Sequence, residues 1–87
     1  MKTRSQSYGK ANVIGKTVER LRKAQKIKQK DFIARLQLEG LDINPTSYSK
    51  LEGQLRLASD IEVFVIAKVL GVKMEELFAN ENPSVIE

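Results

Sequence analysis

One segment, SDIEVFVIAKVLG at positions 59–71, constrains the fold more than any other part of the chain. Ser59 followed three positions later by Glu62 is a capping-box pattern, which predicts the start of a helix, and Gly71 predicts its end. The β-branched residues at 63–69 are also compatible with a strand, but the caps and the length favour a helix. Apolar residues nearly encircle this helix, so we expect it to be the central buried one: Ile61, Val63, Phe64, Val65, Ile66, Ala67, Val69 and Leu70.

The remaining predicted helices are short, and each has a small apolar face. We place them at about 13–26, 29–38, 45–52 and 73–79, with Asn12 and Asn44 as candidate N-caps and Pro45 at a first helical position. Their core residues would be Ile14, Val18, Leu21, Phe32, Ile33, Leu36, Tyr48, Leu51, Met74, Leu77 and Phe78. The prediction is an all-α, five-helix domain at 12–79, preceded by a flexible basic arm at 1–11 and followed by a tail at 80–87.

Positive charge is concentrated in the first third of the chain. Residues 1–30 hold ten of the fifteen Lys and Arg and a single acid, Glu19, whereas residues 31–87 carry a net charge of −5. This asymmetry favours one side facing a polyanion and another side turned away from it. An ordinary solvated surface remains the alternative on charge alone.

The residue inventory argues against catalysis. The chain has neither His nor Cys, so it lacks an imidazole base, a thiolate nucleophile and the usual zinc ligands. Its five glycines fit neither a phosphate loop nor a dinucleotide fingerprint. No apolar run approaches the ~20 residues that span a bilayer, and no signal peptide is evident. We expect a cytoplasmic, non-enzymatic domain without cofactor or metal, and with no membrane partner.

The stretch NPTSYSKLEG at 44–53 suggests a function. Only Tyr48 and Leu51 can anchor this helix, so Thr46, Ser49 and Lys50 are left on its free face, where they could contact base edges in a DNA major groove. Gln29, at the start of the preceding helix, could bind a backbone phosphate beside the positive end of that helix.

Each of these residues also has a simpler interpretation. Gln29 could be an ordinary solvated residue of a first helical turn. Thr46 and Ser49 could serve only to bond local backbone. Lys50 taken alone is an unremarkable surface lysine, and its case rests on its position.

The sequence resembles the lambda-repressor-like, Cro-type helix-turn-helix domain over residues 13–78. The most specific matches are LRKAQKIKQKDF, SYSKLEG and IAKVLGVKMEELF, in the order and spacing of that family. The resemblance implies a recognition helix at 45–52 with base-facing positions at Pro45, Thr46, Ser49 and Lys50. It implies phosphate binding by Gln29 and by the backbone N–H of Gly53, and a partly buried ion pair between Arg22 and Glu52.

Three features depart from the pattern of the family. The segment QLEGLDIN between the two motif helices is about five residues longer than the usual tight turn, as in one branch of the family that has LDI before the recognition helix. Ile33 replaces a small residue, which predicts looser or shifted packing of those helices. Lys28 replaces the usual Ser or Thr cap, which weakens the start of its helix by about 1 kcal/mol.

The expected function is a sequence-specific regulator of transcription that binds double-stranded DNA, most simply a repressor that occupies operator DNA as a homodimer. Arg4 and Lys10 of the basic arm would add phosphate contacts. The subunit contact would use apolar residues near the C-terminus, which could instead only complete the core of the monomer: Met74, Leu77, Phe78, Val85 and Ile86. Two alternatives are an antitoxin that binds a toxin protein and represses its own operon, and a protein-interaction or membrane-surface module built on the basic first helix.

Overall fold

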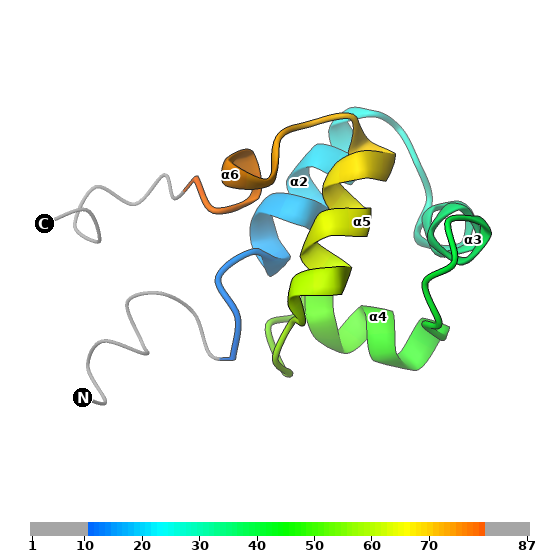
Figure 1. The fold of residues 1–87 in the computed structure, drawn as a ribbon, viewed down its shortest axis with the longest axis horizontal. Coiled ribbons are helices and arrows are strands. Elements are labelled where there is room, and N and C mark those ends of the chain that lie inside the picture. Colours follow the sequence, from blue (N-terminus) through cyan, green and yellow to red (C-terminus); the bar gives the residue numbers. More distant parts are fainter. Residues whose placement is uncertain (1–10, 80–87) are drawn as a thin grey trace, which may run out of the picture.

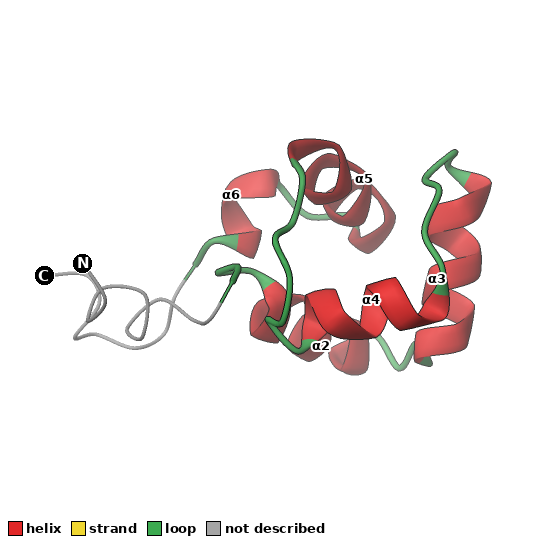
Figure 2. Cartoon of the chain, turned by 90° about the horizontal axis from the view of Figure 1, so that it is seen from below, coloured by secondary structure: helices red, strands yellow, loops and turns green. Residues whose placement is uncertain are grey.

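The computed structural model describes residues 11–79, and in this range the chain is all-α, as predicted. Its helices are α2 (Gly15–Ala24), α3 (Gln29–Leu38), α4 (Pro45–Glu52), α5 (Asp60–Leu70) and α6 (Met74–Leu77). Figure 1 shows α5 lying in front of α2, with α4 along the lower edge, α3 to one side and α6 to the other. Viewed from below, α4 is the nearest helix and its outer side faces the reader (Figure 2).

The predicted caps form at the start of α4 and at both ends of α5, whereas regular α2 begins after Ile14 rather than directly after Asn12. The side-chain oxygens of Asn12 and Asn44 accept the backbone N–H groups of Gly15 and Ser47, each at 2.8 Å. Ser59 and Glu62 form the complete capping box of α5, and Gly71 ends that helix with a φ of 75°. The first and last helices along the chain are shorter than predicted: regular α2 ends at Ala24, and α6 has only four residues.

A single core joins the helices, and it contains most of the predicted residues. Phe32 of α3 and Tyr48 of α4 pack with their ring centroids 5.6 Å apart at a tilted angle, and Ile33 is accommodated as a buried residue. The core also includes the segment between α3 and α4, where Leu41 and Ile43 are buried. Its full membership is Ile14, Val18, Ile27, Phe32, Ile33, Leu36, Leu41, Ile43, Tyr48, Leu51, Val63, Val65, Ile66, Ala67, Leu70 and Leu77.

The prediction that α5 is buried nearly all round is wrong on one side. Ile61 and Phe64 are 64% and 58% exposed, although both were expected in the core. Helices α2, α3 and α6 contact α5 from the other directions, and nothing within residues 11–79 covers this side. A domain of this size has too few elements to surround its longest apolar helix. Met74 and Phe78 are likewise exposed, at 40% and 49%.

The extra residues between α3 and α4 are held in place. Gln37 of α3 donates from Nε2 to the carbonyl oxygen of Ile43 at 2.8 Å. Gly40 has a φ of 94°, which ends α3 with a turn that a side chain would strain. The buried Leu41 and Ile43 then anchor the rest of the segment, so the longer connection is part of the packed structure.

Helices α2 and α4 approach each other closely at Gly15, which the sequence analysis did not single out. A Cβ atom at Gly15 would lie 2.6 Å from the carbonyl oxygens of both Leu51 and Glu52. Nearby, Asn12 donates from Nδ2 to the carbonyl oxygens of Leu51 and Arg56, at 3.0 and 2.9 Å. The start of α2 is therefore fixed directly against the end of α4.

We predict that Gly15→Ala lowers the free energy of unfolding by about 1–3 kcal/mol, because the added methyl group meets backbone atoms that cannot rotate away. Urea denaturation followed by circular dichroism measures the change. Gly53→Ala is the matched control, because Gly53 has an ordinary φ of −79° and its added Cβ would lie 3.3 Å from the nearest atom, the carbonyl oxygen of Ser49. Equal stability of the two variants would contradict the close approach of α2 and α4.

Candidate nucleic-acid interface

A buried ion pair lies beneath the exposed face of α4. Arg22 donates from Nε to Oε2 of Glu52 at 2.7 Å and from Nη2 to Oε1 at 3.3 Å. Both side chains are buried, with exposed fractions of 7% and 5%, so the pair is more deeply enclosed than the resemblance implied. Because desolvated charges are costly unless they are paired and hydrogen-bonded, this contact strongly fixes the position of α4 relative to α2.

Two further donors complete the environment of the Glu52 carboxylate. The Tyr48 hydroxyl donates to Oε2 at 2.5 Å, and Gln29 donates from Nε2 to Oε1 at 3.1 Å. Burial alone would raise the pKa of Glu52, but the hydrogen bonds from Arg22, Tyr48 and Gln29 outweigh it and leave that pKa below its ordinary value. The carboxylate is therefore ionised at neutral pH and acts only as an acceptor.

The same network sets the protonation of its other members. Burial, followed by the hydrogen bond to Glu52, raises the pKa of Tyr48 far above its ordinary value, so the hydroxyl keeps its proton. The hydrogen bond to Glu52 also raises the pKa of Arg22. Arg22 additionally donates from Nη1 to the carbonyl oxygen of Ile27 at 2.7 Å, which ties the turn between α2 and α3 to the ion pair.

The outer face of α4 carries the predicted base-facing residues. Pro45, Thr46, Ser49 and Lys50 are all exposed, whereas Tyr48 and Leu51 of the same helix are fully buried. This is the division expected for a helix with two anchors and a polar free face. Figure 2 shows that this side of α4 is not covered by the other helices.

Gln29 lies where α3 begins and is half-buried against α4. Besides its bond to Glu52, its Oε1 accepts the hydroxyl of Ser49 at 3.2 Å. Only one of the two Nε2 protons is needed for the Glu52 contact, so the second remains able to donate to a phosphate. Exposed Lys28 and Lys30 flank Gln29, and Lys28 makes no side-chain cap bond at the start of α3.

The backbone N–H of Gly53 is not a free donor in the structure. This backbone N–H, expected to bind a phosphate, donates to the carbonyl oxygen of Ser49 at 2.9 Å and so helps to close the last turn of α4. That N–H is therefore already used within the protein, and we remove it from the set of free phosphate donors. Arg4 and Lys10 lie outside the described residues.

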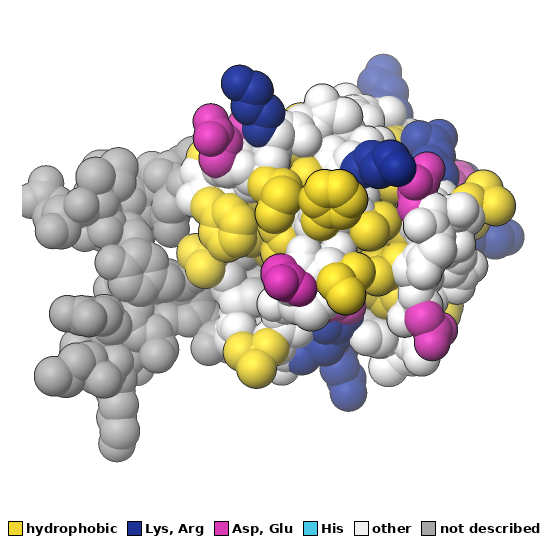
Figure 3. All heavy atoms as spheres, viewed as in Figure 1, with side chains coloured by type: hydrophobic (Ala, Val, Ile, Leu, Met, Phe, Trp, Pro, Cys, Tyr) yellow, Lys and Arg dark blue, Asp and Glu magenta, His cyan; other side chains and the backbone are white. Residues whose placement is uncertain are grey.

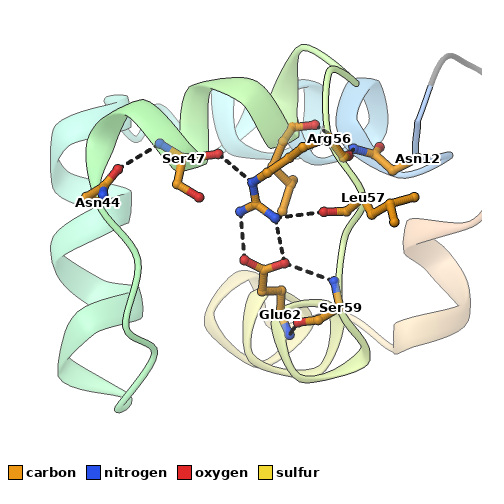
Figure 4. A network of polar contacts seen from close by, with 8 residues as sticks. Asn12, Asn44, Ser47, Arg56, Leu57, Ser59 and Glu62 are labelled. Atoms are coloured by element: carbon orange, nitrogen blue, oxygen red, sulfur yellow. Dashed lines mark hydrogen bonds and ion pairs between the residues drawn. The ribbon is translucent and has the colours of Figure 1, made fainter.

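Arg56 is a structural residue that the sequence analysis missed. Its guanidinium donates to both carboxylate oxygens of Glu62, at 2.9 and 2.7 Å, and to the carbonyl oxygens of Ser47 and Leu57, at 2.9 and 2.7 Å (Figure 4). The contact with Arg56 holds the pKa of Glu62 below its ordinary value. Arg56 thereby connects α4, the loop after it and the start of α5. A six-residue spacing across a loop has no periodic signature, so the sequence offered no signal for this pair.

No family model, curated protein or solved structure matches this chain. Within residues 11–79, no helix combines the length and apolar character needed to cross a membrane. The same residues contain no group of three or more acidic side chains placed to hold a metal ion. The geometry of α3 and α4 is therefore the basis for assigning a function.

We predict that Glu52→Ala lowers the free energy of unfolding by about 3–5 kcal/mol, because it leaves Arg22 buried without its partner. Thermal and urea denaturation measure the loss. Replacing Arg22 and Glu52 together by apolar residues of similar volume should recover a large part of it.

Glu19→Ala provides the control for this prediction, because it breaks the exposed pair between Glu19 and Lys23. Its effect should stay within about 0.5 kcal/mol, as is usual for exposed pairs on a helix. If Glu52→Ala were no more destabilising than Glu19→Ala, the Arg22–Glu52 pair would have to be solvated in solution.

Proposed function

We propose that the protein is a sequence-specific DNA-binding regulator of transcription in which α4 enters the major groove of double-stranded DNA. The observation that carries the proposal is the combination of an exposed polar face on α4 with a buried ion pair beneath it that holds the helix in place. The free face presents Thr46, Ser49 and Lys50, and the Arg22–Glu52 ion pair fixes its orientation. Short hydroxyl side chains and a lysine suit hydrogen bonding to base edges.

Phosphate contacts would orient α4 on the duplex. Gln29 lies at the N-terminus of α3, where the partial positive charge of the helix and a spare side-chain proton both favour an anion. Lys28 and Lys30 add positive charge at the same end of α3. In this proposal the basic residues Arg4 and Lys10, which precede the described range, strengthen binding without sequence preference.

We further propose that two copies bind one operator, because a single short helix reads only a few base pairs. The apolar residues exposed on α5, on α6 and directly after α6 form the surface for this contact, which we call the α5–α6 apolar face: Ile61, Phe64, Met74 and Phe78. Figure 3 shows hydrophobic side chains gathered over these helices. Leu77, also expected at the contact, is fully buried and belongs to the core instead. Val85 and Ile86 lie outside the described residues.

The regulatory mechanism in this proposal is steric. A dimer on operator DNA would exclude polymerase or an activator from overlapping sites, without any catalytic step. In this proposal the protein acts in the cytoplasm.

The antitoxin alternative also has an observation in its favour. Hydrophobic side chains gather over α5 and α6 in the view of Figure 3, whereas the outer side of α4 faces the reader after the quarter turn of Figure 2, so a partner protein could cover the first side while the second holds DNA. Light scattering separates the two proposals, because a homodimer covers this face without any other protein present.

We predict that Lys50→Ala weakens binding to the preferred operator by about 1–3 kcal/mol and relaxes one base position, if Lys50 contacts a guanine edge. Selection of bound sequences from a random duplex pool, followed by titration of the enriched sequence, measures both effects. Lys68→Ala is the control, because Lys68 lies on α5 and pairs with Glu39. A uniform loss across sequences would assign Lys50 to phosphate, and unchanged selection by both Lys50→Ala and Thr46→Ala would contradict α4 as the reading helix.

We predict that Phe64→Ser reduces dimerisation at least tenfold, because it removes a large apolar side chain from the proposed subunit contact. Light scattering and sedimentation, with and without operator DNA, measure the change in mass. Lys16→Ser, at an exposed position on α2, is the control for a surface substitution elsewhere. A parent protein that is monomeric both free and on a full operator would contradict the dimer.

A further inference from the structure

The Ser49 hydroxyl donates its proton to the side chain of Gln29. Ser49 Oγ lies 3.2 Å from Oε1 of Gln29, and an amide oxygen can only accept a hydrogen bond. A serine hydroxyl has one proton, so this contact uses its only donor. Its remaining hydrogen-bonding capacity, two lone pairs on Oγ, is what the exposed side chain offers to a ligand.

The orientation of the Gln29 amide is fixed by the ion pair behind it. Gln29 Nε2 lies 3.1 Å from Oε1 of Glu52, which is ionised and carries no proton. Rotating the amide by half a turn would place its oxygen against the carboxylate oxygen and its NH₂ group against Ser49. The first of those contacts is repulsive, so the carboxylate selects the observed orientation. Arg22 in turn holds the carboxylate at 2.7 Å.

These contacts form a directional chain that begins at a buried charge and ends at an exposed atom. Arg22 and Gln29 both donate to Glu52, and Ser49 donates to Gln29. Each step fixes which group donates in the next one. The negative charge buried under α4 therefore decides the hydrogen-bonding character of a side chain on its outer face.

From this geometry we infer that Ser49 acts only as an acceptor toward DNA and selects a base with an exocyclic amino group in the major groove. Adenine N6 and cytosine N4 are such donors, whereas guanine and thymine present acceptors at their edges. Gln29 is then a positioning residue for base choice, in addition to any contact it makes with phosphate. The inference rests on the proposed function, because it requires α4 to lie in a major groove.

Thr46 provides an internal comparison. Among the hydrogen bonds within residues 11–79, none involves the Thr46 hydroxyl, so that group can rotate and either donate or accept. The Thr46 hydroxyl would therefore bind a donor or an acceptor on the facing base almost equally well. Gln29 should influence the position read by Ser49 and leave the position read by Thr46 unchanged.

The test is sequence selection from a random duplex pool with the parent, Ser49→Ala, Gln29→Leu and the double variant. The parent should enrich adenine or cytosine at the position that Ser49→Ala relaxes, with a preference of about 2- to 12-fold, as expected for one hydrogen bond. Gln29→Leu removes the acceptor of the Ser49 hydroxyl proton, so Ser49 could then donate to a base. Guanine and thymine should therefore also be selected at that position. The double variant should match Ser49→Ala there, and Thr46→Ala should relax a different position whether or not Gln29 is present.

A second measurement keeps the test decisive if Gln29→Leu folds poorly. An operator in which the selected adenine is replaced by purine, or the selected cytosine by pyrimidin-2-one, lacks the amino group. The parent should lose about 2- to 12-fold in affinity for this operator, and Ser49→Ala should lose nothing further.

The outcomes separate this inference from the proposed function. Guanine or thymine at the position relaxed by Ser49→Ala, or no relaxed position at all, would overturn the inference while leaving DNA binding intact. A parent that enriches no sequence would overturn the proposed function and the inference together.

Discussion

The position of α4 depends on one buried carboxylate. Glu52 receives hydrogen bonds from three side chains that come from α2, α3 and α4 itself, namely Arg22, Gln29 and Tyr48. All buried side-chain polar atoms in residues 11–79 have a hydrogen-bond partner, so the desolvation cost of this charge is offset as fully as the fold allows. A charge that needs three helices for its partners allows few alternative arrangements of those helices.

This arrangement explains how a helix with little apolar surface can still be rigid. Tyr48 and Leu51 are the only large apolar side chains that α4 buries, and a helix of eight residues is unstable by itself. The ion pair, the cap at Asn44 and the Arg56 contact to the Ser47 carbonyl supply directional restraints instead. Polar contacts fix the orientation of α4, and its outer face is left free of any packing role.

The sequence predicted the helices better than it predicted their surroundings. Capping patterns placed α4 and α5 because Asn44, Ser59 and Gly71 act through bonds to nearby backbone. Exposure of Ile61 and Phe64 could not be predicted in the same way, since periodicity identifies apolar faces but does not count the elements available to cover them. The need for glycine at position 15 arises from how closely α2 and α4 pass each other, and the Arg56–Glu62 pair forms because of the path of the loop before α5. Neither can be inferred from helical periodicity. The base-facing side chains of α4 were predicted from the sequence pattern and the family resemblance. The hydrogen bond from Ser49 to Gln29 could be found only in the three-dimensional structure.

The packed connection between α3 and α4 has a mechanical consequence. With Leu41 and Ile43 buried and Gln37 bonded to the Ile43 carbonyl, the two helices are braced into one stiff unit. If this unit reads DNA as we propose, it cannot adjust its shape to a poorly fitting site, so the duplex has to deform. Bending and twisting energies vary with base step, and flexible pyrimidine–purine steps deform most easily. Base pairs that α4 never touches would then contribute to operator choice through the stiffness of the DNA.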